Sequence, residues 1–310
     1  MNTENNETNH FYLITTTYNN MNEIKLKDTL YAVKKNLNHS LIHKYLILFE
    51  VNDLEEINYN TFIDKNNKDV FKNKIKPEFL DLLENNKIEL YLIKKRPNYE
   101  FIFKFCNNYD NRIWILTNSD IFFPVWNTHK LKVLTDLNYN KKCVVLTRYN
   151  IMSELTEHIK KKQQGFIHVH NKIKYRTQHK NGGSIDSWIF KTPFNFNKIN
   201  LDFNLGVPEC DGRMNFQLSK IRKVINPCFS IISIHKHVNW SPEGYNRIEH
   251  EGKIYNRKEF NTFMSKKGLI KCPHCKEEFN ADEILQEHLD RVAEQEANLN
   301  EKENKLNKAR

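Results

Sequence analysis

Short apolar runs alternate, through the first 120 residues, with segments whose apolar positions recur at helical spacing. The β-prone runs are residues 10–16, 45–50, 88–93 and 112–117. The helical segments between them are residues 23–37, 77–84 and 99–106. This alternation predicts an α/β protein with a mainly parallel sheet and helices on both faces.

The alternation of strand-like and helical segments becomes irregular in the second half of the chain. A helical segment over residues 125–137 and a strand over 143–147 come next, and the later elements are irregular. Residues 243–268 are polar and aromatic without clear periodicity, so we interpret them as a linker or final lobe. We therefore expect one large domain over residues 10–242, preceded by a disordered segment over residues 1–9.

Polar residues follow directly after the predicted strands. Open α/β sheets bind ligands at the carboxyl ends of their strands, where loops and helix N-termini converge. The candidate ligand contacts at this edge are Thr15, Thr16, Glu50, Arg96, Tyr99, Asn118, Ser119 and Asp120. The alternation itself predicts the fold class and leaves the chemistry open.

Asp120 ends the stretch WILTNSD and places a carboxylate at this edge. Mg²⁺ and Mn²⁺ prefer oxygen ligands, and nucleotide sites combine one or two protein carboxylates with phosphate and water. A single aspartate is therefore sufficient for a nucleotide-bound cation. The alternative interpretation is an Asx turn that only ends the strand.

Residues 10 to about 240 resemble GT-A glycosyltransferases, in which an Asp-x-Asp-like tripeptide after a central strand holds a metal ion on a nucleotide-sugar diphosphate. The resemblance rests on the order of LITTTYN, a strand ending in Glu50, RPNY, and the tripeptide NSD. It implies a Rossmann-like GT-A fold, with Mn²⁺ or Mg²⁺ on Asp120 and the other residues of this edge facing the nucleotide sugar. Asn118 departs from the pattern because it replaces the first acid of the tripeptide.

Two acids of the second half, Asp186 and Asp211, are candidate catalytic residues. An inverting transferase needs a general base near the acceptor hydroxyl, and burial beside a ring such as Trp188 raises the pKa of a carboxylate towards a useful value. In GT-A order, Gly182-Gly183 resembles the loop that approaches the donor sugar, which favours Asp211 as the base and Asp186 as a sugar or acceptor contact. An N-cap role for Asp211 and a turn role for Asp186 stay open.

Further candidate contacts surround these acids. Trp188 and the two glycines are predicted to contact the nucleotide sugar, and Arg148 is expected just after its strand, where it adds a charge-assisted hydrogen bond to phosphate. His235 and His237 share one face of a strand, and neutral imidazole is a good Mn²⁺ ligand. The resemblance implies that one of these histidines completes the metal site; two surface histidines at a strand end are the alternative.

The composition favours a globular protein of a reducing compartment. The chain has 310 residues and 39% hydrophobic residues, enough for a large domain and a small module. No apolar run approaches the roughly 20 residues of a membrane helix, and the six cysteines do not resemble a disulfide framework. We therefore expect a cytoplasmic protein with no membrane span.

The C-terminal segment carries a separate metal motif. Cys272, Cys275, Phe279, Leu285 and His288 match the spacing of a C2H2 zinc finger, but the final histidine is absent. We predict structural zinc on the two cysteines and His288, within a ββα module over residues 269–291 that a helical tail over 292–310 follows.

The charge of this segment argues against DNA binding. Residues 271–310 hold seven Lys/Arg and ten Asp/Glu, a net charge of −3, whereas the first 270 residues hold 41 basic and 28 acidic residues, a net charge of +13, so the basic excess belongs to the large domain. A helix in the major groove needs cationic contacts to phosphate. We expect a protein partner for the tail.

The predicted activity is transfer of a sugar from a nucleoside diphosphate sugar to a hydroxyl acceptor on a glycan or protein, with a divalent metal. One alternative is a nucleic-acid-binding zinc-finger protein. Another is a sugar nucleotidyltransferase, but the segment TTTYNN lacks the glycine-rich loop typical of that class.

Overall fold

The computed structural model describes residues 11–19, 21–51, 61–64, 66–124, 134–151, 153, 167–170, 173–177, 184–206, 210–228, 230–236, 248–250 and 253–255. Several predictions lie outside these residues: those for residues 1–9, most of the helix over 125–137, Gly182, Gly183, His237, the zinc finger and the helical tail.

Strands and helices alternate as predicted in the first part of the chain. The strands are β1 (Phe11–Tyr18), β2 (Ile42–Glu50), β3 (Thr61–Ile63), β4 (Ile88–Ile93), β5 (Ile113–Thr117), β6 (Ile121–Phe122), β7 (Lys142–Ile151), β8 (Ile167–His170), β9 (Ile173–Thr177), β10 (Ile185–Lys191), β11 (Lys223–Ile225), β12 (Ser233–His235), β13 (Ile248–His250) and β14 (Lys253–Tyr255). The α-helices are α1 (Glu23–Leu37), α2 (Pro77–Asp81), α3 (Tyr99–Cys106) and α6 (Cys210–Ser219), and short 3-10 turns cover Lys68–Phe71 and Leu82–Glu84.

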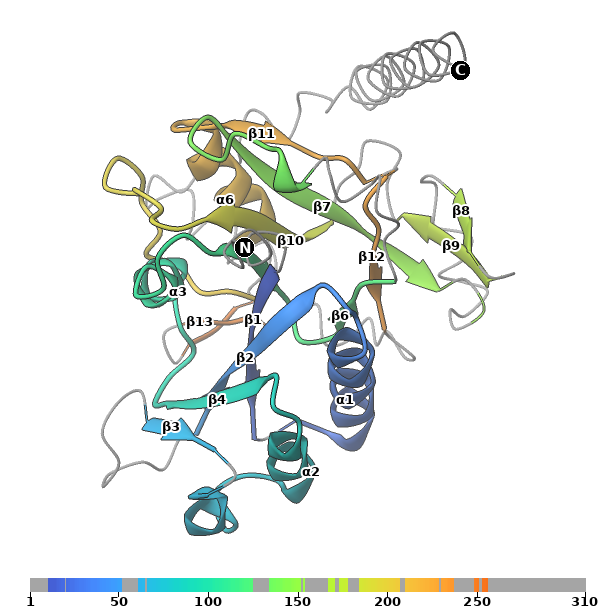
Figure 1. The fold of residues 1–310 in the computed structure, drawn as a ribbon, viewed down its shortest axis with the longest axis vertical. Helices are drawn as coiled ribbons and strands as arrows, with labels where there is room; N and C mark the ends of the chain where they lie inside the picture. Colours follow the sequence, from blue (N-terminus) through green and yellow to red (C-terminus); the bar gives the residue numbers. More distant parts are fainter. Residues whose placement is uncertain are drawn as a thin grey trace, which may run out of the picture.

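Most of these strands belong to one mixed sheet with the order β3-β4-β2-β1-β5-β10-β7-β12-β6 (Figure 1). Strands β4, β2, β1 and β5 pair in parallel, whereas β10 runs antiparallel to both β5 and β7. The α/β class is therefore confirmed. The predicted parallel arrangement holds for β4, β2, β1 and β5, whereas β3 pairs antiparallel with β4 and β10 makes the second half mixed.

Helices cover both faces of the parallel block, so its strands are apolar on both sides. On one face, alternate residues such as Leu13 and Ile47 share a core with α1 and α2. On the other face, Ile14 and Leu48 share a core with α3 and α6 (Figure 1). No helix within the described residues has the length and apolar character to cross a membrane.

Two helices begin at the carboxyl edge of the parallel strands with an asparagine cap. The side chain of Asn22 accepts a hydrogen bond from the backbone N–H of Lys25 in α1, and that of Asn98 accepts one from Phe101 in α3. Each cap satisfies a backbone donor that the first helical turn leaves without a partner. The caps thereby fix where the first turn of α1, with Lys25, begins.

Two features differ from the sequence expectations. Strand β7 continues to Ile151 because β9 and β12 pair with its last residues, so Arg148 lies inside the strand and not after it. The segment predicted as a linker or final lobe contains the antiparallel pair β13 and β14.

His39 ties the end of α1 to the segment that follows β6. Its Nε2–H donates to the carbonyl oxygen of Pro124 at 3.2 Å, and its Nδ1 accepts from the N–H of Leu41 at 3.3 Å. These bonds require the neutral ring. Burial lowers the pKa of His39 to about 4, and the bond to Pro124 offsets this only in part.

We therefore predict that His39 makes stability depend on pH. A histidine whose folded pKa is lowered contributes fully above its unfolded pKa of about 6.5, and this contribution is lost as the pH falls towards about 4. Between pH 7 and 4 the free energy of unfolding of wild type should fall by about 3 kcal/mol more than that of His39→Gln. Urea titrations at several pH values measure this difference.

His43→Gln is the matched control, because His43 is exposed on β2. This variant should keep the pH dependence of wild type. An unchanged pH dependence in His39→Gln would refute the assignment of His39 as the titrating group.

Candidate active site

The loop after β5 carries the predicted tripeptide and is fixed by its backbone. The N–H of Asn118 donates to the carbonyl of Asp186 at 3.3 Å, and the N–H of Ile121 donates to the carbonyl of Asn118 at 3.2 Å. The carbonyl of Asp120 accepts from the N–H of Lys236, directly after β12, at 2.8 Å. The loop is thus held between β10 and β12, which fixes the direction of the Asp120 carboxylate.

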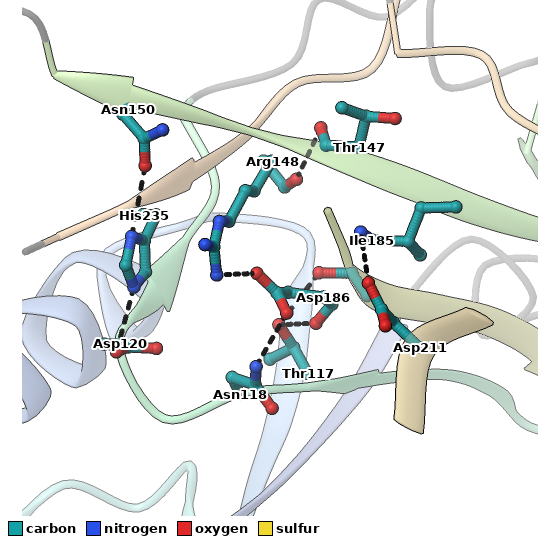
Figure 2. A network of polar contacts seen from close by, with 12 residues as sticks. Thr117, Asn118, Asp120, Thr147, Arg148, Asn150, Ile185, Asp186, Asp211 and His235 are labelled. Atoms are coloured by element: carbon teal, nitrogen blue, oxygen red, sulfur yellow. Dashed lines mark hydrogen bonds and ion pairs between the residues drawn. The ribbon is translucent and has the colours of Figure 1, made fainter. Parts of the chain in front are cut away.

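Two side chains from distant parts of the sequence, Lys25 and His235, meet at Asp120. Oδ2 of Asp120 lies 3.1 Å from Nε2 of His235 and forms an ion pair with Nζ of Lys25. Asp120 is 4% and His235 8% exposed, whereas the side chain of Lys25 is 29% exposed. The other ring nitrogen of His235, Nδ1, lies 3.2 Å from Oδ1 of Asn150 (Figure 2).

The charges at this cluster follow from burial and pairing. Burial alone would raise the pKa of Asp120, but Lys25 and His235 hold it well below its usual value. Burial would lower the pKa of Lys25, yet Asp120 raises it. Burial lowers the pKa of His235, and Asp120 offsets this only in part. At neutral pH the cluster is therefore a carboxylate, an ammonium and a neutral imidazole.

This donor set fits a divalent cation of the Mn²⁺ or Mg²⁺ kind. A carboxylate oxygen and an imidazole nitrogen face each other, and Asn150 lies on the far side of the ring, where ligand histidines usually donate their second N–H. Two protein ligands suffice where phosphate and water complete the shell. Within the described residues, no group of three or more His, Cys, Asp and Glu side chains is arranged to hold a metal ion by itself.

Asp186, at the start of β10, forms a second cluster with the loop. Its Oδ1 accepts from Nδ2 of Asn118 at 2.9 Å, and its Oδ2 pairs with Nη1 of Arg148 at 2.5 Å. Both charged side chains are largely buried, at 14% exposed for Arg148 and 10% for Asp186. Asn118 belongs to the same loop as Asp120, so this loop connects the Asp186 cluster to the Asp120 cluster.

Asp211 lies in the first turn of α6 and reaches the same end of β10. Its Oδ2 accepts from the N–H of Ile185 at 3.3 Å, and its Oδ1 accepts from the N–H of Gly212 at 2.8 Å. The residue is half-buried. Figure 2 shows Asp186 between Asp120 and Asp211, so the structure brings together the three acids that the sequence singled out.

A third group lies at the ends of β1, β2 and β4. Strand pairing sets Tyr18 beside Glu50 and Glu50 beside Ile93. Nε of Arg96 is 3.9 Å from Oε2 of Glu50, and its guanidinium lies 6.0 Å from the ring centroid of Tyr18. Glu50 and Arg96, two of the predicted nucleotide contacts, are therefore neighbours, and Tyr18 is an aromatic neighbour that the sequence pattern did not single out.

The remaining candidates on β1 and in the loop after β5 are Thr15, Thr16 and Ser119. Thr15 donates from Oγ1 to the carbonyl of Thr117 at 2.8 Å, and Thr16 is half-buried on the opposite face of β1. Ser119 is buried with its Oγ 3.4 Å from Oγ1 of Thr29.

Tyr99 and Trp188 are core side chains. They are 0% and 1% exposed, and their rings meet edge to face at 5.4 Å. Nε1 of Trp188 donates to Oδ1 of Asn215 at 3.0 Å, so its polar atom is also satisfied. The structure therefore gives both residues a packing role.

Besides Tyr18, Lys25 and Asn150 are members of the site that sequence reasoning missed. Lys25 is one of many lysines on a helix with an ordinary amphipathic pattern, and Asn150 follows the strand end that was expected at Thr147. The signal for Lys25 was its position in the first turn of a helix that follows a strand at the ligand edge.

Comparisons with known proteins give weak structural similarity. No protein-family model and no curated protein sequence matches the chain. A crystal structure of GalNAc-T7 with UDP, GalNAc and Mn²⁺ aligns with a TM-score of 0.42 and 10% identity, over 78% of this chain and 44% of that one. The chain thus spans less than half the length of that structure.

Two further solved structures align less well. A putative glucose-1-phosphate thymidylyltransferase from Bacillus anthracis in complex with sucrose has a TM-score of 0.35 and 11% identity, over 72% of this chain and 88% of that one. The glycosyltransferase GlyE of Streptococcus pneumoniae TIGR4 has a TM-score of 0.24 and 11% identity, over 56% and 35%. Similarity at this level assigns neither a family nor an activity to the chain.

We predict that Asp186 and Arg148 are strongly coupled. Removing one member of a buried pair leaves the other charge without compensation. Asp186→Asn and Arg148→Met should each destabilise the protein, and a double-mutant cycle by urea denaturation should give a coupling free energy of at least about 1 kcal/mol.

The matched control is the exposed pair of Glu100 and Lys104, whose atoms are also 2.5 Å apart. Its cycle should give no more than about 0.5 kcal/mol, because exposed helix pairs are screened by water. Equal coupling in the two cycles would contradict the structural role of the buried pair.

Proposed function

We propose that this chain is a divalent-cation-dependent glycosyltransferase that moves a sugar from a nucleoside diphosphate sugar to a hydroxyl acceptor. The observation that carries the proposal is the pairing of Asp120 with His235 at the carboxyl end of the parallel strands. The same loop carries Asn118, whose side chain donates a hydrogen bond to Asp186. Parallel α/β sheets bind nucleotides at this edge. The C-terminal cysteines and His288 have no part in this proposal.

Asp120 and His235 hold the cation, and the ends of β1, β2 and β4 hold the nucleotide. A bound cation supplies positive charge that stabilises the departing diphosphate. Tyr18 offers a ring face for a base, while Glu50 and Arg96 offer an acceptor and donors for polar groups of the nucleoside. The loop after β5 carries Asp120, and its backbone hydrogen bonds to β10 and to the residue after β12 fix its position.

Asp211 and Asp186 act on the acceptor side. In the transfer, the acceptor oxygen forms a bond to the anomeric carbon, and the bond from that carbon to the diphosphate oxygen breaks. Asp211 takes the proton of the acceptor hydroxyl, since it is half-buried and its oxygens accept from the backbone N–H groups of Ile185 and Gly212. Asp186, already paired with Arg148, positions hydroxyls of the acceptor through its remaining acceptor capacity.

We predict that Asp120→Asn abolishes cation-dependent donor binding and keeps the fold. Thermal melts of wild type with Mn²⁺ and a panel of nucleoside diphosphate sugars should identify a stabilising donor, worth about 2–3 kcal/mol at roughly 100 times its Kd. The variant should lose this stabilisation. Hydrolysis of the same panel by wild type identifies the donor independently.

Asp110→Asn is the matched control, since Asp110 is exposed and the change in charge is the same. It should bind the donor as wild type does. If Asp120→Asn is stabilised as strongly as wild type, Asp120 is not the cation ligand. If wild type instead releases pyrophosphate from a nucleoside triphosphate and a sugar 1-phosphate, the chain is a nucleotidyltransferase.

We also predict that Asp211→Asn and Asp186→Asn spare donor binding and lower transfer. Loss of the general base should cost on the order of 100-fold or more in kcat. Asp211→Asn should show this larger loss in assays with the identified donor and acceptor. Full activity in Asp211→Asn would rule it out as the base, and small equal losses in both variants would indicate a mechanism without either base.

A further inference from the structure

Lys25 lies where a cation would bind. Its Nζ pairs with Oδ2 of Asp120, the same oxygen that faces Nε2 of His235. The two partners lie 95 residues apart in sequence, and both are fixed by their backbones: Lys25 by the Asn22 cap, Asp120 by the N–H of Lys236. The contact is therefore part of the architecture of the site.

An ammonium and a divalent cation cannot share this oxygen without repulsion. The carboxylate of Asp120 is nearly buried, so water screens the two positive charges weakly. Cation binding must separate Lys25 from Asp120 and move its ammonium away. The side chain has room to do so, because it is 29% exposed while Asp120 and His235 are enclosed.

The position of Lys25 on α1 determines where a displaced ammonium can go. Lys25 belongs to the first turn of the helix that follows β1, at the edge where the parallel strands end. A helix N-terminus favours anions, and a lysine on its first turn adds a mobile point charge. The displaced ammonium therefore remains within reach of a phosphate bound at this edge.

We propose that Lys25 is a built-in competitor for the cation site, so that a divalent cation binds tightly only when a diphosphate arrives to receive the displaced ammonium. The proposal rests on the proposed function for the identity of the site. In the absence of ligand, Lys25 neutralises Asp120 and keeps the affinity for cation low. With diphosphate present, Lys25 pairs with phosphate oxygen and the cation takes its place on Asp120 and His235.

The test is Mn²⁺ binding to the purified full-length protein without nucleotide, measured by the electron paramagnetic resonance signal of free Mn²⁺. Lys25→Met should bind Mn²⁺ roughly tenfold or more tightly than wild type, because the cation no longer breaks an ion pair. Lys25→Gln is the second variant, should Lys25→Met be unstable. Lys27→Met is the matched control: it removes the same charge from an exposed position on α1 and should change the affinity less than twofold.

Pyrophosphate distinguishes competition from simple charge removal. In wild type, adding pyrophosphate should increase the amount of protein-bound Mn²⁺ beyond the amount that pyrophosphate itself chelates. In Lys25→Met this gain should be smaller, because the competitor is absent. An Mn²⁺ affinity of Lys25→Met equal to or below that of wild type would overturn the proposal.

Failure of the underlying function gives a different result. Asp120→Asn in the Lys25→Met background should remove the tight site. If the double variant binds Mn²⁺ as tightly as Lys25→Met, the cation binds elsewhere, and both the metal site of the proposed function and the competition are wrong. If wild type and Lys25→Met bind Mn²⁺ with equal affinity and Asp120→Asn still removes that binding, the metal site is supported and only the competition is wrong.

Discussion

A buried carboxylate needs partners, and the structure around Asp120 is arranged to supply them. The side chain is 4% exposed. Burying an unpaired charge costs roughly several kcal/mol of folding free energy, because the ion loses its hydration. Its partners come from α1 and β12, and its backbone is held by the residue after β12. The loop after β5 therefore joins α1 and β12 to the end of the central strand.

The antiparallel strand β10 extends this arrangement to the other acids. Because β10 lies between β5 and β7, its first residues stand beside the end of β5 and contact Arg148. Asp211 reaches the same point from α6 by accepting from the N–H of Ile185. A strand that departs from the parallel pattern thus joins the carboxyl edge of the parallel strands to Asp186 and Asp211, the two acids proposed to act on the acceptor.

The sequence predicted the features that depend on local periodicity. Helix α1, strand β4 and helix α3 begin and end where the apolar spacing placed them, and Asp120 follows a buried strand as expected. Local periodicity carries no information on contacts between residues far apart in the sequence, so these contacts were not predicted. Lys25 looked like any helix lysine, and Tyr99 looked like a ligand contact because burial by Trp188 and Phe203 depends on the tertiary fold. Arg148 was misplaced because the pairing of β7 with β9 and β12 lengthens that strand.

The central claim is that Asp120 and His235 together bind a divalent cation beside a nucleoside diphosphate. Crystals grown with MnCl₂ and a nucleoside diphosphate, measured at the manganese absorption edge, test this claim most directly. The account predicts an anomalous peak within bonding distance of a carboxylate oxygen of Asp120 and Nε2 of His235, with Lys25 turned from Asp120 towards phosphate. A well-defined nucleotide with no manganese peak at these two side chains, and with Lys25 still paired to Asp120, would contradict it.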